Sequence, residues 1–166
     1  SKGLEYGVTG KFEEARQEFI KGLKVDQFDV SLKEILELTK DVINQRIKRE
    51  TAILLFRAAA KGQKGLWNEV ITEHKKAISI NPNYAPSYNG IGQAYSNKAM
   101  PGEEIDSFKK AIELDHNYVI AYVNLGSAYG RKGMLDEAVN AFKKAMLIDS
   151  NFPEAYASLG IAYLKL

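Results

Sequence analysis

The chain has 166 residues, of which 23 are basic and 21 are acidic, so its formal net charge is only +2. This near balance gives no electrostatic reason to expect binding to nucleic acid or to an anionic membrane surface. The lack of cysteine excludes disulfide bonds and thiolate metal sites, and no stretch approaches the ~20 apolar residues of a membrane span.

Residues 1–29 begin the chain with a partial copy of a pattern that recurs later. From Phe12 to Leu23, apolar residues follow one another at intervals of three and four, which predicts an amphipathic helix. We expect this helix to begin just after Gly10 and to end near Val25.

Residues 30–50 interrupt the pattern and are predicted to form an extra, inserted helix. Ser31 and Glu34 have the spacing of a capping box at its start. Neither Gly nor Pro occurs from position 29 to 61, so this helix could continue directly into the next as one helix of ~30 residues and ~45 Å. The alternative is a turn near Arg49–Thr51, which the register of the later repeats slightly favours.

The remainder of the chain is built on a fixed period. When residues 115–149 are moved back by thirty-four positions onto residues 81–115, fourteen positions are identical. A period of this size indicates a repeat architecture, in which each copy forms two helices that must stack on neighbouring pairs. We therefore predict a single solenoid over residues 1–166, with a partial repeat (1–29), the inserted helix (30–50), a degenerate repeat (51–84), two regular repeats (85–118 and 119–152) and a truncated repeat (153–166).

Gly126 lies inside the first helix of a regular repeat, where glycine costs ~1 kcal/mol relative to alanine. It recurs one period away as Gly92 and Gly160. The recurrence indicates that the paired helix approaches closely here, and we expect Ala138 and Ala145 to be its small counterparts on that helix.

This pattern resembles the tetratricopeptide repeat (TPR) family. The residues that carry the resemblance are Tyr122, Leu125, Gly126, Tyr129, Gly133, Ala138, Phe142 and Ala145, with their equivalents one period away. The resemblance implies an all-α, right-handed superhelical solenoid of antiparallel helix pairs. Three features depart from the family pattern: Tyr122 stands where Trp is usual, Glu104 replaces the small residue found at Ala138, and the helix over 30–50 has no family counterpart.

The resemblance also implies a concave groove, lined by first helices, that binds a peptide or a partner protein. Amides and hydroxyls there would offer donors and acceptors to a peptide backbone or a partner helix, although the same residues could simply be solvated helix positions. The predicted groove residues are Asn89, Gln93, Asn97, Val123, Asn124, Ser127, Arg131, Glu154 and Ser158. The subtype that clamps a terminal carboxylate does not fit, because only Asn124 matches its pattern and Glu154 would repel the ligand.

No catalytic, cofactor or metal site is predicted, and we expect a chain that is not an enzyme. The two histidines, His74 and His116, lie in unrelated repeat positions without a second ligand at metal spacing. The spacing of Tyr88, Tyr122 and Tyr156 places them on the stacking seam rather than on a base-stacking surface.

The leading hypothesis for function is a protein–protein interaction scaffold. One alternative is an assembly element that forms a homodimer through its terminal or inserted helices, because Tyr156, Leu159 and Tyr163 are expected to be partly uncovered. Another is a regulatory region of a larger enzyme. The sequence indicates no compartment, and the cytoplasm is taken only as a default.

Overall fold

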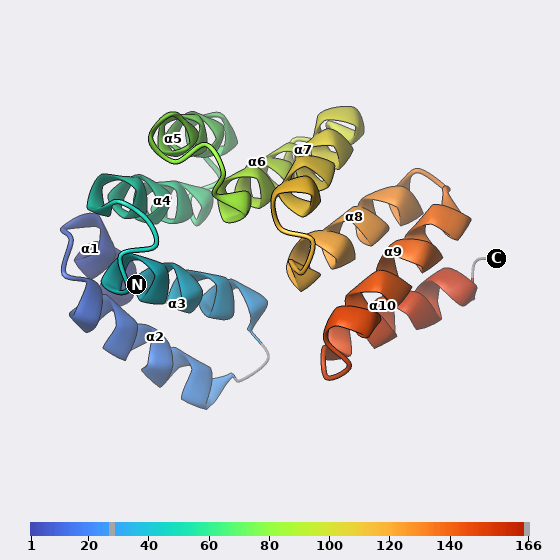
Figure 1. Ribbon diagram of the computed structural model, residues 1–166, viewed down its shortest axis with the longest axis horizontal. Coiled ribbons are helices and arrows are strands. Elements are labelled where there is room, and N and C mark those ends of the chain that lie inside the picture. Colours follow the sequence, from blue (N-terminus) through green and yellow to red (C-terminus); the bar gives the residue numbers. More distant parts are fainter. Residues whose placement is uncertain (27–28, 165–166) are drawn as a thin grey trace. The chain divides into compact units, whose positions relative to one another are not determined.

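The computed structural model describes residues 1–26 and 29–164, which form ten α-helices and no strand (Figure 1). The predicted all-helical fold class is therefore confirmed. The chain divides into two compact units, Ser1–Asn83 and Tyr84–Leu166, each described by itself below. The first unit contains α1 (Lys2–Val8), α2 (Phe12–Val25), α3 (Val30–Ile43), α4 (Arg49–Gly62) and α5 (Trp67–Ile80), and the second contains α6 (Ala85–Asn97), α7 (Pro101–Leu114), α8 (Val119–Arg131), α9 (Leu135–Ile148) and α10 (Pro153–Tyr163).

The stretch that the sequence left as one helix or two is two helices, α3 and α4. The turn between them covers residues 44–48, before the predicted position near Arg49–Thr51. The predicted capping box is wrong, because Asp29 caps α3 and its carboxylate accepts a hydrogen bond from the backbone N–H of Leu32 at 2.9 Å. Asp29 directly precedes the first residue of α3, Val30, and so occupies the N-cap position. From there its carboxylate can accept hydrogen bonds from the free N–H groups of the first turn, whereas Ser31 already lies within that turn.

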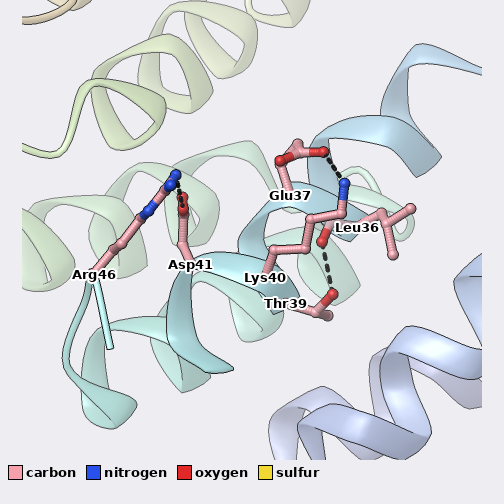
Figure 2. A network of polar contacts seen from close by, with 6 residues as sticks. All are labelled: Leu36, Glu37, Thr39, Lys40, Asp41 and Arg46. Carbon is pink, nitrogen blue, oxygen red and sulfur yellow. Dashed lines mark hydrogen bonds and ion pairs between the residues drawn. The ribbon is translucent and has the colours of Figure 1, made fainter. Parts of the chain in front are cut away.

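Polar contacts along α3 and the following turn are local (Figure 2). Lys40 pairs with Glu37 at 2.5 Å, and the guanidinium of Arg46 lies 3.4 Å from the carboxylate of Asp41. The fully buried Thr39 donates its hydroxyl to the carbonyl of Leu36 at 2.6 Å. Burial of this hydroxyl therefore leaves no unpaired donor.

The turns that follow α1, α3, α4, α6 and α8 share one backbone conformation. Each has a residue with positive φ: Gly10, Gln45, Gly65, Ala99 and Gly133. The next N–H then bonds back across the turn, as Met134 does to the carbonyl of Tyr129 at 3.0 Å and Arg46 does to that of Asp41 at 2.8 Å. The turn after α3 contains this positive-φ residue, as turns after first helices do. However, α3 packs against α2, and the helix that follows it, α4, pairs with α5. The helix α3 therefore resembles the first helix of a repeat whose second helix is missing.

Three aromatic rings form the centre of the first unit. Phe56 of α4 stacks on Phe12 and Phe19 of α2, with ring centroids 5.9 and 6.1 Å apart. A Cβ at Gly7 of α1 would lie 2.3 Å from the Phe56 ring. The glycine thus lets α4 pack directly against α1, as Figure 1 shows.

The second unit repeats one packing device. A Cβ at Gly126 would lie 2.6 Å from the ring of Phe142, and one at Gly92 would lie 2.5 Å from the ring of Phe108. The predicted close approach at Gly126 is therefore confirmed, but the predicted small counterparts are wrong, because an aromatic ring fills the space. Gly160 differs, since no atom of the described structure lies within 4 Å of a Cβ built there.

Candidate functional site

The predicted groove residues lie on α6, α8 and α10, and their side chains differ in accessibility. Asn97 and Arg131 are exposed, and Gln93, Asn124 and Ser127 are partly exposed. Asn89 and Val123 are buried, with 1% and 8% of their surface exposed, so they present little surface to a ligand. Their place in a groove stays a prediction, as it does for the whole set.

Five of the predicted residues line one small hollow of about 110 Å³ in the second unit. The lining comes from α6, α7 and α8: Gln93, Ser96, Asn97, Glu104, Phe108, Asn124, Ser127 and Arg131. All of these except Phe108 carry a polar side chain. The hollow is therefore a concentration of hydrogen-bonding groups of both kinds, donors and acceptors.

Arg131 ties the three helices around this hollow together. Its guanidinium donates to the hydroxyl of Ser96 on α6 at 3.0 Å and forms an ion pair with Glu104 on α7. Glu104 is buried, with 2% of its surface exposed. An ionised carboxylate at such a site requires a partner, so Arg131 is a structural residue as well as a lining residue.

A second link joins the two first helices. The side-chain amide of Asn124 on α8 donates to the amide oxygen of Asn89 on α6 at 3.0 Å. Both cross-repeat contacts, Asn89 to Asn124 and Ser96 to Arg131, join residues thirty-five positions apart. These links hold the two helices at a fixed offset and so position the hollow between them.

The predicted residues on α10 lie apart from this hollow. Glu154 and Ser158 are partly buried and do not line it. One carboxylate oxygen of Glu154, Oε2, is buried and has no hydrogen-bond partner among the described residues.

Sequence reasoning missed Ser96 and Glu104 as lining residues. The signal for Glu104 was visible, because it occupies the position that Ala138 fills one repeat later. Ser96 carried no signal, since its role depends on where Arg131 reaches from the following repeat.

The histidines form no ligand cluster. No group of three or more residues able to hold a metal ion occurs within 1–26 and 29–164. Nδ1 of His74 is buried without a hydrogen-bond partner in that part of the chain, and burial lowers the pKa of His74 to about 4, against the opposing charge of Glu73. Among the described helices, none has the length and apolar character needed to cross a membrane.

Comparison with known families agrees with the repeat geometry of the second unit. Residues 105–133 and 131–166 match a family described as TPR repeat, and residues 85–118 match one described as tetratricopeptide repeat. Residues 85–166 belong to the tetratricopeptide repeat family. The TPR matches cover the helices that surround the hollow and α10. No curated protein matches the chain.

Solved TPR structures resemble the fold. The crystal structure of MamA is 27% identical, with a TM-score of 0.64, over 99% of this chain and 84% of that one. The Sgt2 TPR domain from Aspergillus fumigatus is 20% identical, with a TM-score of 0.69, over 72% of this chain and 80% of that one. The first TPR of Spaghetti (RPAP3), bound to the HSP90 peptide SRMEEVD, is 18% identical, with a TM-score of 0.67, over 71% of this chain and 94% of that one.

Proposed function

We propose that this chain is a protein–protein interaction module whose second unit binds an extended segment of a partner protein. The observation that carries the proposal is the polar hollow between α6, α7 and α8, which five independently predicted residues line. A TPR structure with a bound peptide is one of the solved structures that resemble this fold. That likeness supports peptide binding as a use of the fold.

The chemistry of the hollow favours an uncharged, polar stretch of the ligand. Arg131 and Glu104 neutralise each other, while Gln93, Asn124 and Ser127 offer amide and hydroxyl groups. Such groups can pair with both the N–H and the C=O of a peptide backbone. A peptide with a terminal carboxylate fits less well. In the subtype that clamps such a carboxylate, the position that corresponds to Glu154 on α10 contributes to binding, and here its negative charge would repel the ligand.

The test must separate ligand contacts from structural links. Gln93→Ala and Ser127→Ala alter lining residues outside the Arg131–Glu104 pair, so the fold should be retained. We expect recovery of the natural partner on the immobilised double variant to fall about tenfold, the equivalent of ~1.4 kcal/mol. Lys144→Ala, on the exposed surface of α9, is the matched control and should leave recovery unchanged. Equal recovery on all three proteins would refute the groove.

Self-association is a second candidate, favoured by apolar surface on α10. Tyr156 is 48% exposed, Ile161 is 56% exposed and Leu164, which follows the helix, is 89% exposed. Apolar surface of this kind can be covered by a second copy of the chain. Sedimentation equilibrium of the wild type and of Ile161→Glu tests this, and a wild type that stays monomeric at high concentration would refute it.

A further inference from the structure

The first unit holds a much larger cavity, with a volume of about 930 Å³. It lies between the start of α2, the turn from α3 to α4, and the end of α5, and α6 to α10 contribute no lining residue. It is a broad depression open to solvent, and its volume lies within the range of ligand-binding sites (~300–1,000 Å³).

The lining of the cavity is mainly cationic. It carries four cationic residues and two anionic residues: Lys11, Arg46, Lys48 and Arg49 against Glu13 and Glu14. This net charge of +2 equals the formal net charge of the whole chain. The residues outside the lining are balanced, with 19 basic and 19 acidic side chains.

The two lysines are the lining cations without an ion pair among the described residues, and the ammonium of Lys11 lies over the Tyr6 ring, 6.0 Å from its centroid. Arg49 donates to the carbonyl of Gly10 at 2.8 Å. Arg46 forms an ion pair with Asp41 (Figure 2). In contrast, none of the ion pairs found among the described residues involves Lys11 or Lys48, and both side chains are exposed.

The position of these lysines is unfavourable for the fold alone. Lys11 and Lys48 are the N-cap residues of α2 and α4, where the helix dipole disfavours positive charge. In the regular repeats, the residues in the N-cap position before α7 and α9 are the uncharged Met100 and Met134. A negatively charged ligand would turn this local repulsion into attraction.

Apolar side chains from α2, α3 and the turn line the same cavity. Phe12, Val42 and Ile47 are buried, and Ile43 is partly exposed. Because the first three present little surface, the apolar contact open to a ligand beside the lysines is Ile43. Glu13 and Glu14 would also repel a uniform polyanion such as nucleic acid. A peptide can place its carboxylates at the lysines and keep them away from these glutamates.

We propose that this cavity is a second binding site, which takes a segment of a partner protein rich in Asp or Glu and containing apolar residues. Lys11 and Lys48 would pair with its carboxylates, while Ile43 would contact one of its apolar side chains. The site is separate from the hollow in the second unit. One chain could then join two partner segments, which is what a scaffold requires.

The experiment is a subtractive selection of short random peptides displayed on phage. The peptide library is first passed over the Lys11→Glu, Lys48→Glu double variant, which removes every peptide that binds elsewhere on the chain. The peptides that then bind the wild-type chain are sequenced and synthesised. We expect sequences enriched in Asp, Glu and apolar residues, with affinity at least about tenfold weaker for the double variant. Lys64→Glu with Lys75→Glu, at two exposed positions of the same unit outside the lining, changes the net charge by the same amount and is the matched control, which should bind as the wild type does.

Several outcomes would overturn the proposal. The first three are a selection that leaves no peptide, peptides without acidic enrichment, and equal loss of binding in the control with Lys64→Glu and Lys75→Glu. The fourth is displacement of the peptides by inorganic phosphate or heparin as effectively as by excess unlabelled peptide. Circular dichroism of each variant must match that of the wild type. As a second readout, Ile43→Ser should weaken the binding of the same peptides although it does not change the charge of the site. The double variant Gln93→Ala, Ser127→Ala alters only the hollow in the second unit and should bind the selected peptides as the wild type does. The two proposed sites can therefore be refuted independently.

Discussion

The ion pair between Arg131 and Glu104 offers the sharpest test of how the second unit is held together. Arg131→Ala removes the cation and leaves the carboxylate of Glu104 inside the unit, where the Glu104 side chain is 3% exposed. A buried carboxylate without a partner loses its hydration and gains no compensating charge. We therefore expect Arg131→Ala to destabilise the protein.

The magnitude lies between two limits. Pairs exposed to solvent contribute roughly 0–1 kcal/mol, and breaking a buried pair costs about 3–5 kcal/mol. Here the carboxylate is buried but the Arg131 side chain is 53% exposed, so water screens the pair from one side. We expect a loss of about 2 kcal/mol in the free energy of unfolding, or about 4–8 °C in Tm for a chain of this size.

A double-mutant cycle measures the pair itself. Glu104→Ala restores the residue type that the next repeat has at Ala138, which is fully buried. In that background Arg131→Ala should cost only a few tenths of a kcal/mol, because no buried charge remains, and the coupling energy should be about 1–2 kcal/mol. Urea unfolding followed by circular dichroism gives each value. Lys132→Ala, on the exposed neighbour of Arg131, is the control and should change little.

The reasoning fails if Arg131→Ala costs the same with and without Glu104. That result would mean that the arginine acts through its hydrogen bond to Ser96 or through helix propensity. An unchanged stability in Arg131→Ala would likewise show that water reaches the carboxylate.

Three further predictions follow from buried contacts. Gly126→Ala should lower Tm, because its Cβ would meet the Phe142 ring at 2.6 Å, whereas Gly160→Ala has open space and should raise Tm through helix propensity. Phe56→Ala, which empties the aromatic centre of the first unit, should cost about 3–5 kcal/mol in urea unfolding; a loss below 1 kcal/mol would contradict that centre. Because the folded pKa of His74 is lowered to about 4 from an unfolded value of ~6.5, its contribution is present above pH 6.5 and lost as pH falls toward 4. The Tm of His74→Phe should therefore fall less between pH 6.5 and pH 4 than the Tm of the wild type. An equal fall of Tm in both proteins would refute a buried neutral imidazole.

Helix positions were predictable where the signals are local. The predicted start of α2 after Gly10 and its end near Val25 agree with the structure. Each depends on apolar periodicity and on a glycine within a few residues. The capping residue of α3 was predicted wrongly because two candidates, Asp29 and Ser31, lie within the same turn, and local rules do not rank them.

Accessibility within the predicted groove was not predictable from periodicity. Asn89 and Gln93 follow one another along the same stripe of α6, yet Asn89 is buried and Gln93 is partly exposed. The difference arises because α8 covers one end of this stripe and Asn124 bonds to Asn89. A helical wheel assigns both residues to one face and carries no information about how far the next helix overlaps that face.

The sequence by itself determined the all-helical fold, the repeat period and the polar stripe of α6 and α8, because these depend on residues that are neighbours along the chain. Only the tertiary structure decided that Glu104 pairs with Arg131, twenty-seven positions away, and that Lys11 and Lys48 share a cavity. Such contacts depend on the offset between packed helices. That offset is set by the fit of side chains such as Phe56 and Phe142 against glycines on other helices, which no local pattern of the sequence specifies.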